Sequence, residues 1–399
     1  MLQYRYKKGN VDLIKLGTRL GEISLRKKRI LLLSEGFGAG HTQAAQALSV
    51  SLRQYYPGLT TRVIELGAFL HPTLFPWIFN AYRRTVSTKP HLYGKLYRFQ
   101  YMKSLNPLTQ LALHRILYSQ TDEVIRQLRP DVIVCTHPFP NLVVSRLKKS
   151  GLSIPLCTVI TDYDAHGTWV SSEVNRYMVS TAEVKQKLVN RGIPADRIQI
   201  TGIPIHPSFW QHNNREEIRL QYGLKRMPTV LVMGGGWGLF DNDLFMDDLI
   251  KWREHIQLII CLGRNERTLQ QLSNDPRFQH PHIKLLGFTK EIDKLMDVSH
   301  LLITKPGGIT CTEGLVKGIP MLFYKPIPGQ EEENMQYFLD QGFGEPIISG
   351  QTIDVRMRQM ILEFASDQEI DGIRPSLQSN PDDNYDPRSC SQAIIELLN

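Results

Sequence analysis

The sequence lacks the features of a membrane-spanning or exported protein. None of its 399 residues belongs to an apolar run as long as the ~18 residues of a membrane span, and Met1–Arg29 has no apolar core of the signal-peptide kind. The chain has only five cysteines, an odd number, and they show no metal-binding spacing. We therefore expect a cytoplasmic protein whose cysteines are buried free thiols.

Acidic residues are absent from one long stretch of the N-terminal half. Residues 66–120 carry seven Lys or Arg and no Asp or Glu, and residues 1–29 carry a net charge of +7. Because the whole chain has a net charge of only +8, the positive charge is concentrated in its first third. This concentration indicates an anionic partner, either a membrane surface or a nucleic acid.

Aromatic residues interleave with these bases between residues 69 and 102. Part of this segment must form core helix, but rings and bases without carboxylates are also typical of peripheral proteins that dock on anionic lipid. Single-stranded RNA would use the same groups, yet no nucleic-acid module accompanies them, so we predict no nucleic-acid partner. We expect a peripheral position on the cytoplasmic face of the cell membrane, with residues 1–29 as an amphipathic helix or a basic tail. The predicted docking residues are Trp77, Arg83, Arg84, Lys95 and Arg98.

Short apolar runs alternate with helical segments from residue 30 onwards. This alternation predicts parallel, doubly wound sheets and places the protein in the α/β class. A chain of 399 residues has room for two domains, and the segment 201–209, dense in proline and glycine, suits a junction. The predicted parts are a basic extension (1–29), a Rossmann-like domain (30–203), a linker (204–226), a second Rossmann-like domain (227–370) and a closing loop and helix (371–399).

The stretch 304–334 carries the strongest functional signal. Gly307 and Gly308 follow an apolar strand, and Thr310 lies at the expected start of a helix, with Glu313 at capping-box spacing. Glycine amides at a helix N-terminus favour a phosphate group. Because the Glu313 carboxylate would repel that phosphate, Glu313 is expected to bind sugar hydroxyls instead. Further hydroxyl-binding groups follow at Gln330, Glu331 and Asn334. The stretch predicts a polyhydroxylated ligand that carries a diphosphate.

Two other glycine turns follow predicted strands. Gly235 and Gly236 form a second phosphate-type loop after the strand 229–233. The turn 35–41 has the spacing G-F-G-A-G-H, which differs from GxGxxG and argues against a Rossmann cofactor. His41 lies at a helix start, where the dipole disfavours its protonated form and keeps it available as a base.

Polar residues also follow two further strands of the first sheet. His137 follows the strand 131–136, and Asp162, His166 and Trp169 follow the strand 156–160. Open α/β sheets place their chemistry at the carboxyl ends of strands, so Asp162 is a second candidate base, or a residue that orients one. No third ligand of suitable spacing accompanies Asp162 and His166, so we predict that no metal is bound.

These motifs together resemble one family. The chain is similar to the monogalactosyldiacylglycerol synthase and diglucosyldiacylglycerol synthase group, in glycosyltransferase family 28. The resemblance rests on the motifs TKPGG-x-T-x-x-E followed by P-x-PGQE-x-x-N, on T-D-x-x-x-H-x-x-W, and on G-x-G-H-x-x-A-A-x-A-L. The resemblance covers most of residues 30–345. It implies a GT-B fold, with two Rossmann-like domains facing across a cleft, and glycolipid biosynthesis by inverting transfer of a hexose from a UDP-sugar to diacylglycerol. No cofactor and no metal are implied.

The resemblance also implies roles for individual residues. The C-terminal domain would hold the diphosphate at Thr310 and the glycines, the ribose at Glu313 and the base beside Phe288. The sugar and the phosphate edge would meet Gln330, Glu331 and Asn334. The N-terminal domain would hold the acceptor, with His41 or Asp162 as base. The other residues on the acceptor side would be His137, His166 and Trp169.

Several alternatives remain open at this point. The donor is UDP-glucose or UDP-galactose, with glucose preferred. The family's more distant relative is the peptidoglycan N-acetylglucosaminyltransferase, so one rival is a UDP-N-acetylglucosamine transferase acting on a lipid-linked cell-wall precursor. The other rival is a non-catalytic protein that senses UDP-sugars, which predicts donor binding without sugar transfer.

Overall fold

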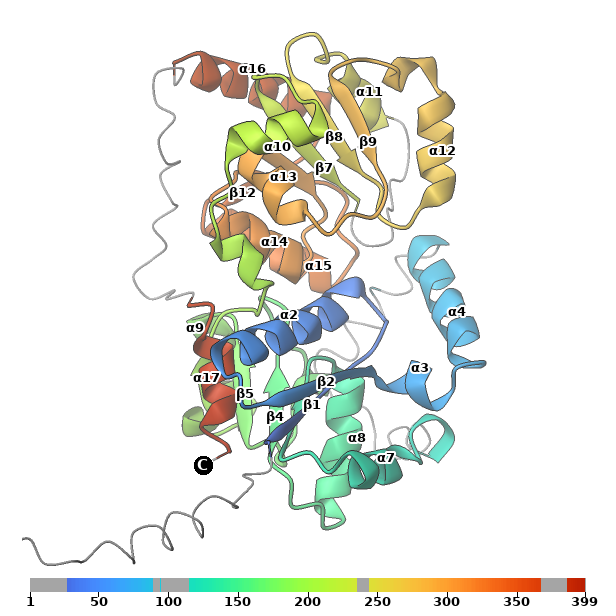
Figure 1. Ribbon diagram of the computed structural model, residues 1–399, viewed down its shortest axis with the longest axis vertical. Coiled ribbons are helices and arrows are strands. Elements are labelled where there is room, and N and C mark those ends of the chain that lie inside the picture. The colour runs from blue at the N-terminus through green and yellow to red at the C-terminus, as the bar shows by residue number, and fades with distance from the viewer. Residues whose placement is uncertain (1–26, 89–93, 95–114, 235–243, 367–385, 399) are drawn as a thin grey trace, which may run out of the picture.

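The protein folds around two parallel sheets of six strands each, as a computed structural model shows (Figure 1). The structure describes residues 27–88, 94, 115–234, 244–366 and 386–398. The first sheet has the order β2-β1-β3-β4-β5-β6, and the second has the order β12-β11-β10-β7-β8-β9. Both are parallel throughout, with the crossovers that helices provide, so the predicted α/β class and doubly wound sheets are confirmed.

The first sheet is buried on both faces. Its strands are β1 (Arg29–Ser34), β2 (Thr60–Glu65), β3 (Val132–Cys135), β4 (Leu156–Val159), β5 (Arg176–Val179) and β6 (Ile198–Ile200). The helices of this domain are α2 (Ala39–Tyr55), α3 (Leu66–Leu70), α4 (Phe75–Thr88), α7 (Thr121–Leu128), α8 (Pro138–Lys149) and α9 (Ala182–Asn190). Every residue of β3, Val-Ile-Val-Cys, is buried, because helices cover both sides of a parallel sheet.

The second sheet repeats this plan. Its strands are β7 (Thr229–Met233), β8 (Gln257–Cys261), β9 (Ile283–Leu286), β10 (Leu301–Thr304), β11 (Met321–Phe323) and β12 (Gly344–Pro346). Its helices are α10 (Arg215–Tyr222), α11 (Leu244–Ile250), α12 (Glu266–Asn274), α13 (Ile292–Val298), α14 (Gly308–Val316), α15 (Gln330–Asp340) and α16 (Gly350–Ser366). Short 3-10 turns lie at Gly167–Trp169, Ala195–Arg197, Pro207–Trp210 and Pro276–Phe278. The core on one face of this sheet contains residues of α13, α14 and α15, and the opposite core contains residues of α11 and α16.

Two elements differ from the sequence-based expectation. The sequence of residues 111–128, which is followed by Arg129-Pro130, predicts one helix, but the described part of the chain breaks at Tyr118–Gln120 before α7 begins. The break has a tertiary cause, because the buried Tyr118 hydroxyl donates a hydrogen bond of 3.0 Å to Glu35 on the glycine turn. Strand β12 escaped prediction, because Gly-Glu-Pro has no apolar pattern and is held only by its pairing with β11.

The chain joins the two domains at more than one place. The segment 204–226, expected as a linker, contains helix α10, and Ile218 of that helix is buried in the core of the second domain. The closing helix, predicted within residues 371–399, is α17 (Ser389–Ile395), and it returns to the first domain beside β5 (Figure 1). There the Ser391 hydroxyl lies 2.7 Å from that of Ser51 on α2.

The five cysteines are all buried and free, as predicted. Within the described ranges, no helix has the length and apolar character needed to cross a bilayer.

Candidate functional site

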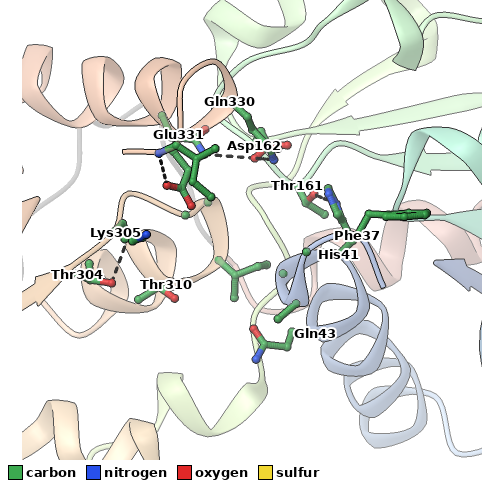
Figure 2. Close-up of a pocket in the computed structure, with 18 of the residues that line it drawn as sticks. Phe37, His41, Gln43, Thr161, Asp162, Thr304, Lys305, Thr310, Gln330 and Glu331 are labelled. Carbon is green, nitrogen blue, oxygen red and sulfur yellow. Dashed lines mark hydrogen bonds between the residues drawn. The ribbon is translucent and has the colours of Figure 1, made fainter. Parts of the chain in front are cut away.

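A cavity of about 160 Å³ lies between the two domains, at the carboxyl ends of strands from both sheets (Figure 2). Its walls combine the glycine turn and α2 of the first domain with α14 and α15 of the second. The predicted site residues that line it are His41, Asp162, Gly307, Gly308, Thr310, Gln330, Glu331 and Asn334. The fold therefore brings residues that are far apart in the sequence into one cavity.

A second cavity, of about 500 Å³, adjoins the first. The two share Gln43, Ile309 and Thr310, so they form one continuous groove along α14. Phe288 and Glu313 line the second cavity rather than the first. Together the two cavities offer an elongated site, polar at one end and flanked by an aromatic ring at the other.

Helix α14 begins in a different way from the prediction. Its N-cap is Gly307, which has no side chain to form a capping box, and Thr310 lies inside the first turn. A capping interaction occurs instead on α15, where the Glu332 carboxylate accepts a hydrogen bond of 2.9 Å from the Gly329 N–H. The Thr310–Glu313 box is therefore wrong, but the free amides of the first turn of α14 still face the groove.

The two glycines at the start of α14, Gly307 and Gly308, have different surroundings. A Cβ on Gly307 would meet no atom within 4 Å, so this residue borders open space. A Cβ on Gly308 would lie 2.3 Å from the backbone oxygen of Thr161 in the other domain, which is an impossible approach. Gly308 is therefore required by the contact between the domains, a reason that the sequence does not reveal.

Glu313 is half-buried in the second cavity. Burial, with a smaller contribution from the charge of Asp293, raises the pKa of its carboxyl group to about 8. Because the group is largely protonated at neutral pH, it can donate a hydrogen bond as well as accept one and does not repel an anion.

His41 is buried on the wall of the first cavity. Its Nδ1 lies 2.7 Å from the Thr161 hydroxyl oxygen (Figure 2). Its ring contacts the His137 ring edge-on at 4.7 Å. Burial lowers the pKa of His41 to about 4, so the ring is neutral at physiological pH. The cause is mainly desolvation rather than the helix dipole that we invoked from the sequence.

The other predicted residues of the acceptor side lie behind His41. His137, His166 and Trp169 do not border the cavity, and Trp169 is completely buried. Burial lowers the pKa of His166 to about 4 and that of His137 well below its usual range. The rings of His137 and Trp169 lie 4.7 Å and 6.2 Å from that of His41, and the place of all three residues on the acceptor side stays a prediction.

Asp162 belongs to the first domain but has its partners in the second. Its Oδ1 accepts hydrogen bonds from the side-chain amides of Gln330 at 2.6 Å and Asn334 at 3.2 Å (Figure 2). Burial raises its pKa to about 6, and the two amide hydrogen bonds oppose that shift. The carboxylate is therefore mostly ionised at neutral pH.

Glu331 and Lys305 lie near one another on the second domain's side of the cavity. The Oε2 atom of Glu331 accepts a hydrogen bond of 2.7 Å from the Ile327 N–H. Burial raises the pKa of Glu331 to about 7, while that N–H and the Lys305 charge lower it. Lys305 was not among the predicted site residues, although a cation two residues before a pair of glycines, at the end of a strand, was a usable signal.

The predicted docking residues lie partly outside the described chain. On α4 the Trp77 side chain is 78% exposed, Arg84 is exposed and Arg83 is half-buried. Lys95 and Arg98, like Gly235 and Gly236 of the second glycine loop, lie outside the described residues.

The other side of α4 reaches the site, because Phe75, Phe79 and Tyr82 surround the ring of Phe37 in the glycine turn.

No group of three or more His, Cys, Asp or Glu residues that could hold a metal ion occurs within the described ranges. The expectation of a metal-free reaction stays a prediction.

Comparison with known proteins gives matches along most of the chain. The family described as "Monogalactosyldiacylglycerol (MGDG) synthase" matches residues 41–205, and the "Glycosyltransferase family 28 C-terminal domain" matches residues 229–367. A protein of Bacillus pumilus named processive diacylglycerol beta-glucosyltransferase is 33% identical over 327 residues, which are 79% of this chain and 82% of that protein. A protein of the same name from Staphylococcus carnosus is 32% identical over 80% of this chain and 81% of its own.

Solved structures share the fold at much lower sequence identity. MurG of Acinetobacter baumannii has a TM-score of 0.54 and 14% identity, and the alignment covers 92% of this chain and 99% of that chain. HepE of Anabaena, in complex with UDP, has a TM-score of 0.53 and 15% identity over 93% and 99% of the two chains. With its two parallel six-stranded sheets facing across a groove, the chain has the GT-B fold and belongs to the monogalactosyldiacylglycerol synthase and diacylglycerol glucosyltransferase family of glycosyltransferases.

Proposed function

We propose that the protein transfers glucose from UDP-glucose to diacylglycerol with inversion, giving a β-linked glycolipid. The observation that carries this proposal is the groove along α14, which joins a polar cavity containing His41 to a longer cavity beside Phe288. Relatives that share about a third of its residues over most of its length are named processive diacylglycerol beta-glucosyltransferases.

The groove would hold the donor with its base in the second cavity and its sugar in the first. The uracil and ribose would occupy the second cavity, with Phe288 beside the base and protonated Glu313 at the ribose hydroxyls. The diphosphate would lie at the first turn of α14, where free backbone amides, the helix dipole and the Lys305 ammonium favour negative charge. The glucose would then reach the first cavity, beside Gln330 and Glu331.

His41 is the base that we assign to the reaction. When Nδ1 carries the ring proton and donates it to Thr161, Nε2 has a free lone pair for the acceptor hydroxyl. As the acceptor oxygen bonds to the anomeric carbon, its proton passes to His41 and the bond from that carbon to the diphosphate oxygen breaks. UDP leaves with the bonding electrons, stabilised by the α14 amides and Lys305. A single displacement from the opposite side inverts the anomeric centre.

The acceptor is proposed to arrive from a membrane surface. Exposed Trp77 and Arg84 lie on the outer side of α4, and the inner side of α4 packs on Phe37 directly before the catalytic histidine. Rings at the interface and cations at the headgroups are typical of peripheral docking. We propose that α4, with Lys95 and Arg98 further along the chain, holds the cleft at the lipid surface.

An assay of sugar transfer tests this function. Purified protein is incubated with radiolabelled UDP-glucose or UDP-galactose and vesicles containing diacylglycerol, and lipid products are resolved by the number of sugars. We expect glucosylated diacylglycerol from UDP-glucose. Transfer from UDP-galactose alone would contradict the assigned hexose, and donor binding without any transfer would support a sensor. In a parallel incubation with UDP-N-acetylglucosamine and a polyprenyl-diphosphate acceptor, sugar transfer would support the cell-wall alternative.

His41→Ala should lower kcat by roughly 10²–10⁴, the range expected for loss of a general base. The UDP affinity should be unchanged, since His41 lies away from the second cavity. His255→Ala, which removes an exposed histidine elsewhere on the second domain, is the matched control. A His41→Ala protein with wild-type kcat would remove His41 from this role.

A further inference from the structure

The contact between Asp162 and helix α15 crosses the junction of the two domains. Asp162 is buried in the loop after β4, and its backbone oxygen accepts a hydrogen bond of 2.8 Å from the Ser180 hydroxyl. Its main chain is therefore held in place by the first domain. Gln330 and Asn334 lie one turn apart on α15, and both direct their side-chain amides at the same oxygen, Oδ1 (Figure 2 shows the Gln330 bond).

Asn334 has its hydrogen-bonding groups committed to the first domain. The residue is completely buried, its Oδ1 accepts from the Tyr163 N–H at 2.8 Å, and its Nδ2 donates to Asp162. Tyr163 extends this contact, because its ring stacks on Tyr337 at 4.5 Å and its hydroxyl lies 2.8 Å from that of Thr312 on α14. Asn334 thus connects the domains, and its capacity to bind a sugar is small.

Gln330 is placed differently. It is half-buried, and one N–H of its amide is used by Asp162 while its carbonyl oxygen and second N–H remain for a ligand in the cavity. Without Asp162 the amide could rotate by 180° and exchange its donor and acceptor. With Asp162 in place, one orientation is favoured, because a carboxylate accepts hydrogen bonds and donates none.

We propose that Asp162 is a positioning residue that sets the orientation of the Gln330 amide, so that the hexose of the donor is recognised by a site built from both domains. This inference rests on the proposed function, whose donor sugar lies in the first cavity. It assigns Asp162 a role other than that of the base, and Asn334 the role of an interdomain connection rather than a sugar contact. Selectivity for the hexose then depends on a residue of the acceptor domain.

Calorimetric binding of UDP and of UDP-glucose to the full chain tests the proposal. Asp162→Ala removes the acceptor that orients Gln330. It should weaken UDP-glucose binding about tenfold, the size of one oriented hydrogen bond, and should change UDP binding less than about threefold. Asp162→Asn keeps an oxygen that can accept from Gln330 and Asn334, so it should retain most of the affinity. A general loss of structure would weaken both ligands equally. Asp164→Ala is the matched control, since it removes a neighbouring buried carboxylate that pairs with Lys187.

An exchange of the two side chains provides a second variant. Asn334→Asp alone places two carboxylates against each other and should weaken UDP-glucose binding. In the double variant Asp162→Asn/Asn334→Asp, the carboxylate moved to α15 can accept from both the Tyr163 N–H and the amide introduced in the loop after β4. That amide nitrogen takes the place of Oδ1 and donates to Gln330 as well, so the Gln330 amide is turned over. The melting temperature should therefore recover towards the wild-type value while UDP-glucose binding stays weakened about tenfold. Recovery of UDP-glucose binding together with the melting temperature would overturn the proposal.

Steady-state kinetics separate this role from catalysis. A positioning role predicts that Asp162→Ala raises KM for UDP-glucose about tenfold, with kcat falling by less than about tenfold. A fall in kcat of ~10² or more in Asp162→Asn, with unchanged UDP-glucose affinity, would make Asp162 the base and sink the proposal. If the wild-type protein transfers no glucose, the proposed function fails, while the comparison of UDP with UDP-glucose binding still decides the positioning role.

Discussion

A carboxyl group lies buried at the start of the glycine turn that leads to His41. Glu35 is completely inaccessible, and its Oε1 accepts hydrogen bonds from the Gly67 N–H at 2.9 Å and the Tyr118 hydroxyl at 3.0 Å. Its Oε2 has no hydrogen-bond partner among the described residues. Burial is the main reason that its pKa rises to about 8, whereas an ordinary glutamate has a pKa near 4.5. The folded protein therefore holds a proton that the unfolded chain has released at neutral pH.

The sign of the resulting pH dependence follows directly. Since the pKa of Glu35 is higher in the folded protein than in the unfolded chain, protonation of Glu35 favours the folded state. This contribution to the free energy of unfolding is complete below pH ~4.5 and is lost as the pH rises towards 8. Glu35→Gln keeps an acceptor for Gly67 and is neutral at every pH. We expect the urea midpoint of the variant to match that of the wild type near pH 5 and to exceed it at pH 8.5. The difference in free energy of unfolding at pH 8.5 should be up to a few kcal/mol. Glu123→Gln, at an exposed site of the same domain, should change neither midpoint. A wild-type pH dependence retained in full by Glu35→Gln would contradict this account.

At the scale of one element, helix α4 has two unlike sides. Its inner side contributes Phe75 and Tyr82 to the rings around Phe37, and its outer side exposes Trp77 and Arg84. In Figure 1, α4 lies at the edge of the first domain that is remote from α17. The helix therefore packs on the glycine turn with one side and exposes the other side to solvent.

Vesicle binding checks the docking role of α4. Trp77→Ala should weaken cosedimentation with anionic vesicles about tenfold or more, because a buried aromatic ring contributes ~2 kcal/mol at such an interface. The double variant Arg83→Gln/Arg84→Gln should weaken vesicle binding by ~1 kcal/mol per cation, and the loss should be larger at low salt than at high salt. Leu220→Ala removes a similarly exposed apolar residue from the second domain and is the control. Cosedimentation that is insensitive to all α4 changes would refute the docking surface.

At the scale of the whole molecule, the last helix of the chain completes the first domain. Ala393 and Ile394 of α17 are fully buried against the first sheet, in one cluster with Leu48 and Leu52 of α2. The Cys390 thiol lies 3.1 Å from the Thr201 hydroxyl at the end of β6. The two domains are thus linked both by the segment after β6 and by the end of the chain.

Ile394→Ala should destabilise the first domain selectively. The loss should be ~2–5 kcal/mol, the range found when a buried isoleucine is replaced by alanine. Calorimetry should show a lower melting temperature for one transition, whereas UDP binding at room temperature should be retained because the α14 site lies in the second domain. Val355→Ala on α16, where the side chain is 67% exposed, is the control. Equal loss of UDP affinity and stability would contradict separate domain stabilities.

Much of this protein could be predicted from its sequence. Short apolar runs such as Leu301–Leu302–Ile303 specified buried parallel strands, because a strand covered on both faces needs mostly apolar residues. Glycines after those strands located the groove, and the two motifs around Gly307 and Gln330 identified the family. The sequence pattern also indicated that His41 would be neutral, although the physical cause is burial.

The tertiary structure decided the rest, since it depends on contacts between residues far apart in the chain. Gly308 is a glycine because Thr161 of the other domain leaves no room for a Cβ, and Asp162 has its partner Gln330 on α15, 168 residues away. No local pattern contains these pairings. What the sequence determined is the set of elements and the chemistry they carry, and what only the fold determined is which groups meet across the cleft and which are already committed to each other.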